Sequence, residues 1–284
     1  MITCASTQST HHEVGEMDTY LLKFGGNAIR GKEDLARLSK EIVLLTKSGV
    51  NIVLVHGGGP EITDEMEKRG LVAKKVAGVR ITDADGLKVA TEVLRNINND
   101  VVTALRDAGA KAFGIAGFEF ISSVKKAPLK AVENGKDVMV DMGLVGEVDY
   151  VNIDYLEAVL KSGAVPVIFP ICAGPTGHLN VNADTVAAGI AAAMGVKEMI
   201  QITDVPGILM DVNDPKSKIN SLTLEEVDKL IADGTISGGM IPKVEACRSA
   251  IEAGVGKVRM VNGKDKTIVS DLLTDGTHGT VIMG

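Results

Sequence analysis

Short apolar runs alternate with amphipathic stretches along most of this 284-residue chain. The apolar runs predict strands at residues 19–24, 51–56, 112–115, 164–169, 198–203 and 258–261. Between them, apolar residues at helical spacing predict helices at residues 33–47, 83–107, 154–162, 183–194, 224–232 and 240–253. Such alternation is typical of an α/β fold whose mostly parallel sheet is covered on both faces. Ligands of such sheets bind at the carboxyl ends of the strands, so the loops there are candidates for a functional site.

Two segments depart from this alternation. Residues 138–151 are short, β-like and punctuated by glycine, which predicts a hairpin beside the main sheet. Residues 1–18 are polar, lack the charged start and apolar middle of a secretory signal, and predict a disordered tail. No repeat or linker divides residues 19–284, so we expect them to form one domain.

Composition and charge narrow the classes of function. The net charge is −7 without any basic run, so nucleic-acid binding has little support, and an anionic ligand must be held by a few placed cations. The three cysteines, Cys4, Cys172 and Cys247, are odd in number and far apart, which is typical of reduced thiols in a cytoplasmic protein. No apolar run approaches the roughly 18 residues of a membrane span.

The first two predicted strands end in glycine-rich turns. Lys-Phe-Gly-Gly at residues 23–26 lets backbone N–H groups approach an anion near Lys23, although a plain turn with a surface lysine explains it equally well. His-Gly-Gly-Gly-Pro at residues 56–60 leads into a helical pattern, where free N–H groups form an anion site. It matches neither the Walker loop nor the dinucleotide fingerprint. His56 has no visible acid or nucleophile partner and is interpreted as structural.

Polar residues precede two further helices. Arg80, just before the long predicted helix, can clamp a carboxylate through its planar fork or form an ordinary surface salt bridge. Asn182 is placed to cap the helix that follows it. Asn180 and Asp184 are four residues apart and can face one cleft, one binding an acceptor and the other orienting a lysine. That all three serve only the helix cap stays open.

A last glycine pair precedes the helix that carries Lys243. Gly238 and Gly239 expose backbone donors, and Lys243 in the first turn is disfavoured by the helix dipole unless an anion is shared. Two lysines, two glycine-rich loops and one carboxylate suit phosphoryl transfer, which needs positioning and charge neutralisation more than a nucleophilic side chain. A carboxylate acceptor is itself the nucleophile and needs no general base at neutral pH.

In this order, the motifs resemble the amino-acid kinase superfamily, and within it the acetylglutamate kinases. From about residue 19 onward, the resemblance is carried by K-F-G-G-N-A, V-H-G-G-G-P, G-V-R-I-T-D, N-V-N-A-D, T-D-V-P-G-I and G-G-M-I-P-K-V. It implies a three-layer sandwich around a mostly parallel eight-stranded sheet. The implied activity is ATP-dependent phosphorylation of the side-chain carboxylate of N-acetyl-L-glutamate, with Mg²⁺ held mainly by the nucleotide and no metal ligand from the protein.

The resemblance also implies a role for each matching position. Lys23 and Lys243 stabilise the transferring phosphoryl group, and Asp184 holds both lysines in place. The substrate-binding positions are Gly58, Gly59, Arg80 and Asn180. The nucleotide-binding positions are Gly25, Gly26, Asp204, Val205, Gly207, Ile208, Leu209, Thr235, Ile236 and Ser237. The acceptor is therefore expected in a half at about residues 19–175, and the nucleotide in a half at about residues 176–284.

Two stretches depart from the acetylglutamate kinases. Arg-Asn-Ile-Asn-Asn at residues 95–99 replaces a Gly-Lys-Val-Asn-Lys-like stretch, and Gly-Phe-Glu-Phe at residues 117–120 replaces a Gly-Lys-Asp-Gly-like one. A kinase for a related carboxylate such as aminoadipate is therefore an alternative. A catalytically silent nitrogen-sensing subunit is another, although retention of both lysines and the aspartate argues against it.

The resemblance implies a homodimer as the assembly. Arginine-inhibited relatives form hexamers through an N-terminal helix, which needs an apolar stripe at helical spacing. The stretch before Thr19 has only scattered apolar residues, so we expect a dimer that arginine does not inhibit.

Overall fold

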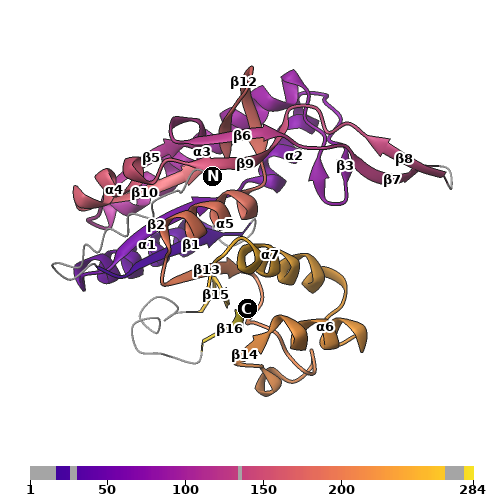
Figure 1. Cartoon of the computed structure of the whole chain (residues 1–284). Coiled ribbons are helices and arrows are strands. Elements are labelled where there is room, and N and C mark those ends of the chain that lie inside the picture. Colours follow the sequence, from indigo (N-terminus) through magenta and orange to yellow (C-terminus); the bar gives the residue numbers. More distant parts are fainter. Residues whose placement is uncertain (1–16, 26–30, 134–135, 266–277) are drawn as a thin grey trace, which may run out of the picture.

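The computed structural model describes residues 17–25, 31–133, 136–265 and 278–284. Within them the main sheet has eight strands in the order β14-β16-β15-β13-β1-β2-β10-β5 (Figure 1). Their bounds are β1 Thr19–Phe24, β2 Asn51–His56, β5 Lys111–Ala116, β10 Ala164–Phe169, β13 Glu198–Thr203, β14 Ser221–Thr223, β15 Lys257–Asn262 and β16 Thr280–Met283. Neighbouring strands are parallel except for β15 and β16. The predicted α/β fold with a mostly parallel sheet is therefore confirmed.

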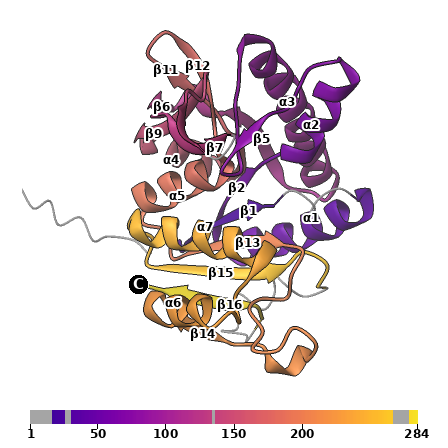
Figure 2. The ribbon, with the colours of Figure 1, turned by 90° about the vertical axis from the view of Figure 1, so that its right-hand side faces the viewer.

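Helices cover both faces of this sheet (Figures 1 and 2). On one face, α1 (Lys32–Lys47) and α3 (Ala84–Asp107) pack over side chains that include Leu22 of β1. On the other, α4 (Ile153–Lys161), α5 (Ala183–Met194), α6 (Leu224–Ala232) and α7 (Ile241–Glu252) pack in the cluster that contains Leu21. Because strand side chains alternate between faces, Lys23 lies on the same face as Leu21, toward α5 and α7.

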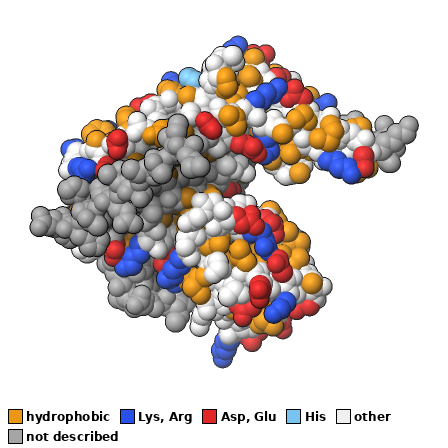
Figure 3. Space-filling view, viewed as in Figure 1, with side chains coloured by type: hydrophobic (Ala, Val, Ile, Leu, Met, Phe, Trp, Pro, Cys, Tyr) orange, Lys and Arg blue, Asp and Glu red, His pale blue; other side chains and the backbone are white. Residues whose placement is uncertain are grey.

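Smaller elements rise above the strand ends. α2 (Gly59–Lys68) follows β2, and the hairpin of β3 (Lys75–Val76) and β4 (Val79–Arg80) leads into α3. A small barrel contains β6 (Ile121–Lys125), β9 (Val145–Val151), β11 (Ile171–Gly174) and β12 (Gly177–Val181). Figure 3 shows the surface hollowed between the part that carries β7 and β8 and the part that carries α6 and α7.

The predicted hairpin at residues 138–151 is wrong in its pairing. Its first three residues belong to β8 (Lys136–Val140), which pairs with β7 (Leu129–Glu133), whereas β9 forms its second half and pairs with β6 in the small barrel. Its place beside the main sheet is confirmed. The error arises because the sequence of one strand does not reveal its partner, and β7 (Leu-Lys-Ala-Val-Glu) is too short to show a strand pattern of its own.

The predicted tail lies outside the described residues except for Met17 and Asp18. Cys172 and Cys247 are buried and form no disulfide, and burial raises the pKa of each thiol to about 12, so both stay protonated. Cys4 lies outside the described residues. Among the described helices, none combines the length and the apolar character needed to span a membrane.

Candidate active site

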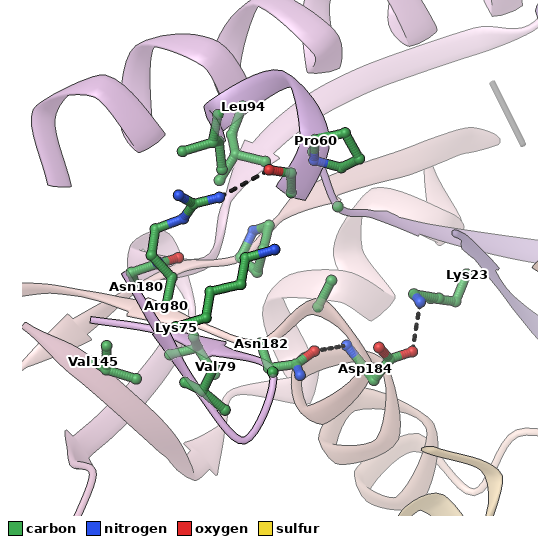
Figure 4. A pocket seen from close by; sticks show the side chains of 18 of the residues that line it. Lys23, Pro60, Lys75, Val79, Arg80, Leu94, Val145, Asn180, Asn182 and Asp184 are labelled. Atoms are coloured by element: carbon green, nitrogen blue, oxygen red, sulfur yellow. Dashed lines mark hydrogen bonds and ion pairs between the residues drawn. The ribbon is translucent and has the colours of Figure 1, made fainter. Parts of the chain in front are cut away.

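A cavity of about 270 Å³ opens at the carboxyl ends of β1 and β2 (Figure 4). We call it the acceptor cavity. All four predicted substrate-binding positions line it, namely Gly58, Gly59, Arg80 and Asn180. Lys23 and Asp184 line it as well, so the fold brings residues from four separate segments of the chain to one place.

Two of the glycines that follow β2 in the cavity lining, Gly58 and Gly59, differ in what glycine contributes at each position. A Cβ on Gly58 would lie 2.6 Å from Ile97 Cδ1 and 3.1 Å from Leu94 Cδ2, so a larger residue would require these α3 side chains to shift. A Cβ on Gly59 would meet nothing within 4 Å, so packing does not require this glycine. Gly59 is the first residue of α2, whose opening N–H groups have no partner within the helix. The turn therefore presents backbone donors toward the cavity, as an anion requires.

Arg80 is buried without an acidic partner among the described residues. Its Nη2 donates to the carbonyl oxygen of Gly59 at 2.8 Å and to Thr63 Oγ1 at 2.7 Å, and its Nη1 lies 3.4 Å from Met66 Sδ. Burial lowers the pKa of Arg80, because desolvation disfavours the charged form. Since Arg80 is only 7% exposed and forms no ion pair within the described chain, the surface-salt-bridge alternative is wrong. The guanidinium is fixed in place with its charge available to a ligand carboxylate.

Lys23 and Asp184 form an ion pair with 2.5 Å between Nζ and Oδ1. The two side chains are 13% and 27% exposed, so water screens the pair only in part. Asp184 is in the first turn of α5, where the backbone N–H of Asp184 donates to Asn182 Oδ1 at 2.8 Å. The predicted cap at Asn182 is confirmed. Asn180 Nδ2 donates to Thr82 Oγ1 at 3.2 Å, which holds the amide at the cavity wall.

A second cavity of about 280 Å³ lies on the other side of this ion pair. Lys23 and Asp184 line both cavities, and the second one adds Gly25, Asp204 and Lys243. We call it the α7 cavity, because Lys243 comes from the first turn of α7.

The lysine of the α7 cavity pairs with a different aspartate. Lys243 Nζ lies 3.2 Å from Asp204 Oδ1, next to the end of β13. Of the two lysine contacts expected of Asp184, the structure shows only the one with Lys23. Asp184 and Lys243 both line the α7 cavity, but Asp184 pairs with Lys23 from the end of β1, and Lys243 pairs with Asp204, the residue after β13.

Only some of the predicted nucleotide-binding positions line the α7 cavity. Gly25 and Asp204 line the α7 cavity, and Gly26 lies outside the described residues. Ile208 and Ile236 are buried in the core, so only their backbones are available to a ligand. Gly207 is buried at a φ of 124°, and a Cβ there would lie 2.6 Å from Thr280 Oγ1. Backbone conformation and packing therefore both favour glycine at this position. The remaining positions, half-buried or exposed, lie outside the lining of the α7 cavity: Val205, Leu209, Thr235 and Ser237.

His56 is a buried neutral residue beneath the glycine turn. Its Nδ1–H donates to the carbonyl oxygen of Gly57 at 2.9 Å, and its Nε2 accepts from Asn98 Nδ2 at 3.0 Å. Burial lowers the pKa of His56 to about 4. The same amide nitrogen of Asn98 donates to the carbonyl oxygen of Val167 at 2.9 Å. These contacts fit the structural interpretation of His56.

The two departures from the acetylglutamate kinases do not line the acceptor cavity, although Ile97 in the first lies against Gly58, which does. Residues 95–99 and 117–120 are absent from its described lining. Asn98, in the first departure, supports His56. Phe118, in the second, stacks on His178 with ring centroids 4.1 Å apart. Both replacements therefore have local structural roles.

One cation of the acceptor cavity was missed by sequence reasoning. Lys75 of β3 lines the cavity opposite the glycine turn (Figure 4). Its strand has only two residues, too few for an alternating pattern to show which way the side chain projects.

Comparison with known proteins agrees with this arrangement. Residues 18–262 match the model of the amino acid kinase family, and the chain belongs to that family. Within it, the acetylglutamate kinase of Methanosarcina barkeri is 43% identical over 267 residues, which cover 92% of this chain and 83% of that protein.

Solved structures show the same fold. A Streptococcus mutans protein superposes with a TM-score of 0.72 at 25% identity, covering 94% of this chain and 98% of the other. Carbamate kinase from Giardia superposes with a TM-score of 0.67 at 16% identity, covering 95% of this chain and 99% of the other.

Proposed function

We propose that this protein transfers the γ-phosphoryl group of ATP to the side-chain carboxylate of N-acetyl-L-glutamate, giving N-acetylglutamyl 5-phosphate in arginine biosynthesis. One observation carries the proposal: the Lys23–Asp184 ion pair lines two cavities, one with Arg80 and the other with Lys243. A phosphoryl group passing from one cavity to the other stays beside a lysine throughout. Transfer depends mainly on such neutralisation and positioning.

The chemistry needs no proton transfer. A carboxylate oxygen of the acceptor bonds to the γ-phosphorus as the bond from phosphorus to the bridging oxygen breaks, which releases ADP and an acyl phosphate. Lys23 and Lys243 neutralise the charge on the phosphoryl oxygens, and Asp184 orients Lys23. Arg80 holds the acceptor's other carboxylate. We propose that Mg²⁺ arrives with the nucleotide.

The charges of the acceptor cavity favour an acylated amino group. Among its described lining residues, Asp184 is the single acid, and it is paired with Lys23. The ammonium of free glutamate, aspartate or aminoadipate would therefore face Lys23, Lys75 and Arg80 without a carboxylate partner, at a cost in desolvation. An N-acetyl group is neutral. This supports N-acetylglutamate over the aminoadipate alternative.

The assembly and the functional halves belong to the same proposal. We place the acceptor within about residues 19–175 and the nucleotide within about residues 176–284, with Asn180 and Asp184 of the second half facing the acceptor. We further propose a cytoplasmic homodimer that arginine does not inhibit.

The test is ADP release in the presence of MgATP and a panel of acceptors: N-acetylglutamate, glutamate, aspartate, aminoadipate and carbamate. We expect N-acetylglutamate to give the highest kcat/KM. Faster turnover of aminoadipate would establish the alternative kinase. Nucleotide binding without turnover of any acceptor would establish the silent subunit.

A further inference from the structure

Lys75 and Arg80 form a directly opposed pair in the β3–β4 hairpin. The two residues are register partners of an antiparallel ladder, in which opposed side chains project from the same face. Both line the acceptor cavity. Figure 4 shows the Lys75 ammonium directed into the cavity, between Arg80 and Lys23.

This pairing is unfavourable in the free protein. Like charges directly opposite each other destabilise a β-ladder, and this ladder has only two residue pairs. The groups that hold Arg80, the Gly59 carbonyl and the Thr63 hydroxyl, are uncharged and leave its charge in place. No described carboxylate forms an ion pair with Lys75 or with Arg80. An anion between the two cations would relieve their repulsion.

We infer that Lys75 positions the acceptor, its ammonium binding, together with Arg80, the acceptor carboxylate that is not phosphorylated. The inference deepens the proposed function and rests on it. Arg80 is buried and fixed by its hydrogen bonds, whereas Lys75 stands on a flexible stem at the cavity's edge. The pair therefore selects acceptors with a second carboxylate.

The location of Lys75 separates this role from phosphoryl transfer. Lys75 lines the acceptor cavity but not the α7 cavity, where Lys243 lies. Its loss should therefore weaken acceptor binding, seen in KM for the acceptor, and leave KM for ATP unchanged. A group acting on the phosphoryl in the transition state would lower kcat instead.

The chain offers a matched control in the neighbouring Lys74, which is exposed and does not line the cavity. Lys75→Met and Lys74→Met change the net charge equally and leave the same hairpin. For Lys75→Met we expect KM for N-acetylglutamate to rise about ten-fold, as for the loss of one hydrogen bond to a charged group. kcat and KM for ATP should stay within about two-fold, and Lys74→Met should match the wild type in all three.

A substrate change identifies the group that Lys75 binds. N-acetylglutamate whose α-carboxylate is replaced by an amide keeps the reacting side chain. In the wild type this amide should raise KM, whereas in Lys75→Met it should raise KM markedly less, because the two changes remove the same contact. Equal rises in both proteins would overturn the inference.

Two other results would also overturn it. One is a fall in kcat at unchanged acceptor KM in Lys75→Met. The other is the same rise in acceptor KM in Lys74→Met, which would show that any positive charge near the cavity has this effect and that Lys75 makes no specific contact. Failure of the proposed function would look different: wild-type protein would form no acyl phosphate from N-acetylglutamate.

Discussion

The ammonium of Lys23 lies 2.5 Å from Asp184 Oδ1, which joins the end of β1 to the first turn of α5. The helix dipole favours the carboxylate at that end of α5, and the carboxylate fixes the lysine. The pair stands in the wall between the acceptor cavity and the α7 cavity. Its position makes Lys23 the cation that accompanies the phosphoryl group from donor to acceptor.

Removing either lysine should therefore abolish most of the activity. Lys23→Ala and Lys243→Ala should each lower kcat by about two to three orders of magnitude, the usual loss for one electrostatic stabiliser of a transition state. Steady-state kinetics at saturating ATP and acceptor measure this, with circular dichroism as the control for folding. A folded variant that keeps more than about a third of the wild-type kcat would remove that lysine from the mechanism.

The two aspartates should differ in importance. Asp184→Asn leaves Lys23 without its anion, and a misplacement of about 1 Å can cost about a hundred-fold in rate, so we expect a loss of that order in kcat. Asp204→Asn should cost much less, because the Asp204–Lys243 pair is 46% and 29% exposed and such pairs contribute little. Comparison of the two kcat values is the measurement. Equal losses would mean that Asp204 orders its lysine as firmly as Asp184 does.

Arg80→Lys tests the carboxylate clamp. Lysine keeps the charge but cannot reproduce the fork that binds both the Gly59 carbonyl and the Thr63 hydroxyl. We expect a strong rise in KM for the acceptor and little change in KM for ATP. Equal damage to both KM values would instead indicate that Arg80 serves only the fold.

His56 should make the folded state sensitive to acid. Its pKa is about 4 in the folded protein against an ordinary 6.5, so the unfolded chain binds more protons between those values. This component of stability is complete above about pH 6.5 and is lost as the pH falls toward about 4, on the order of 3 kcal/mol in all. His56→Gln removes the ionisable group.

Urea unfolding of both proteins at about pH 7.5 and about pH 4.5 measures the effect. The free energy of unfolding should fall less with acidification in His56→Gln than in the wild type. The same fall in both proteins would show that His56 does not resist protonation.

The central strands could be read from the sequence because buried parallel strands are uninterrupted apolar runs. The predicted strands at residues 19–24, 51–56, 164–169 and 198–203 coincide with β1, β2, β10 and β13. The edge strand β14 and its neighbour β16 were missed, since each is very short. Short strands carry little periodic signal.

The candidate site was only partly predictable, for a related reason. Glycine turns and the Asn182 cap are local, so the sequence shows them. The partners of Lys23 and Lys243 depend on how β1, β13, α5 and α7 pack together. No local sequence pattern predicts that tertiary arrangement. Lys75 was missed because β3 has only two residues, so the sequence does not show to which side the Lys75 side chain projects. Only the pairing of Lys75 with Arg80 shows it.

The central claim is that a carboxylate of the acceptor receives the phosphoryl group, and trapping the product tests it most directly. The protein is incubated with MgATP and N-acetylglutamate, and hydroxylamine converts any acyl phosphate to a stable hydroxamate. The account predicts hydroxamate in amounts equal to the ADP released, and almost none with Lys23→Ala. Release of ADP with inorganic phosphate but without hydroxamate would contradict it, because water would then be the acceptor.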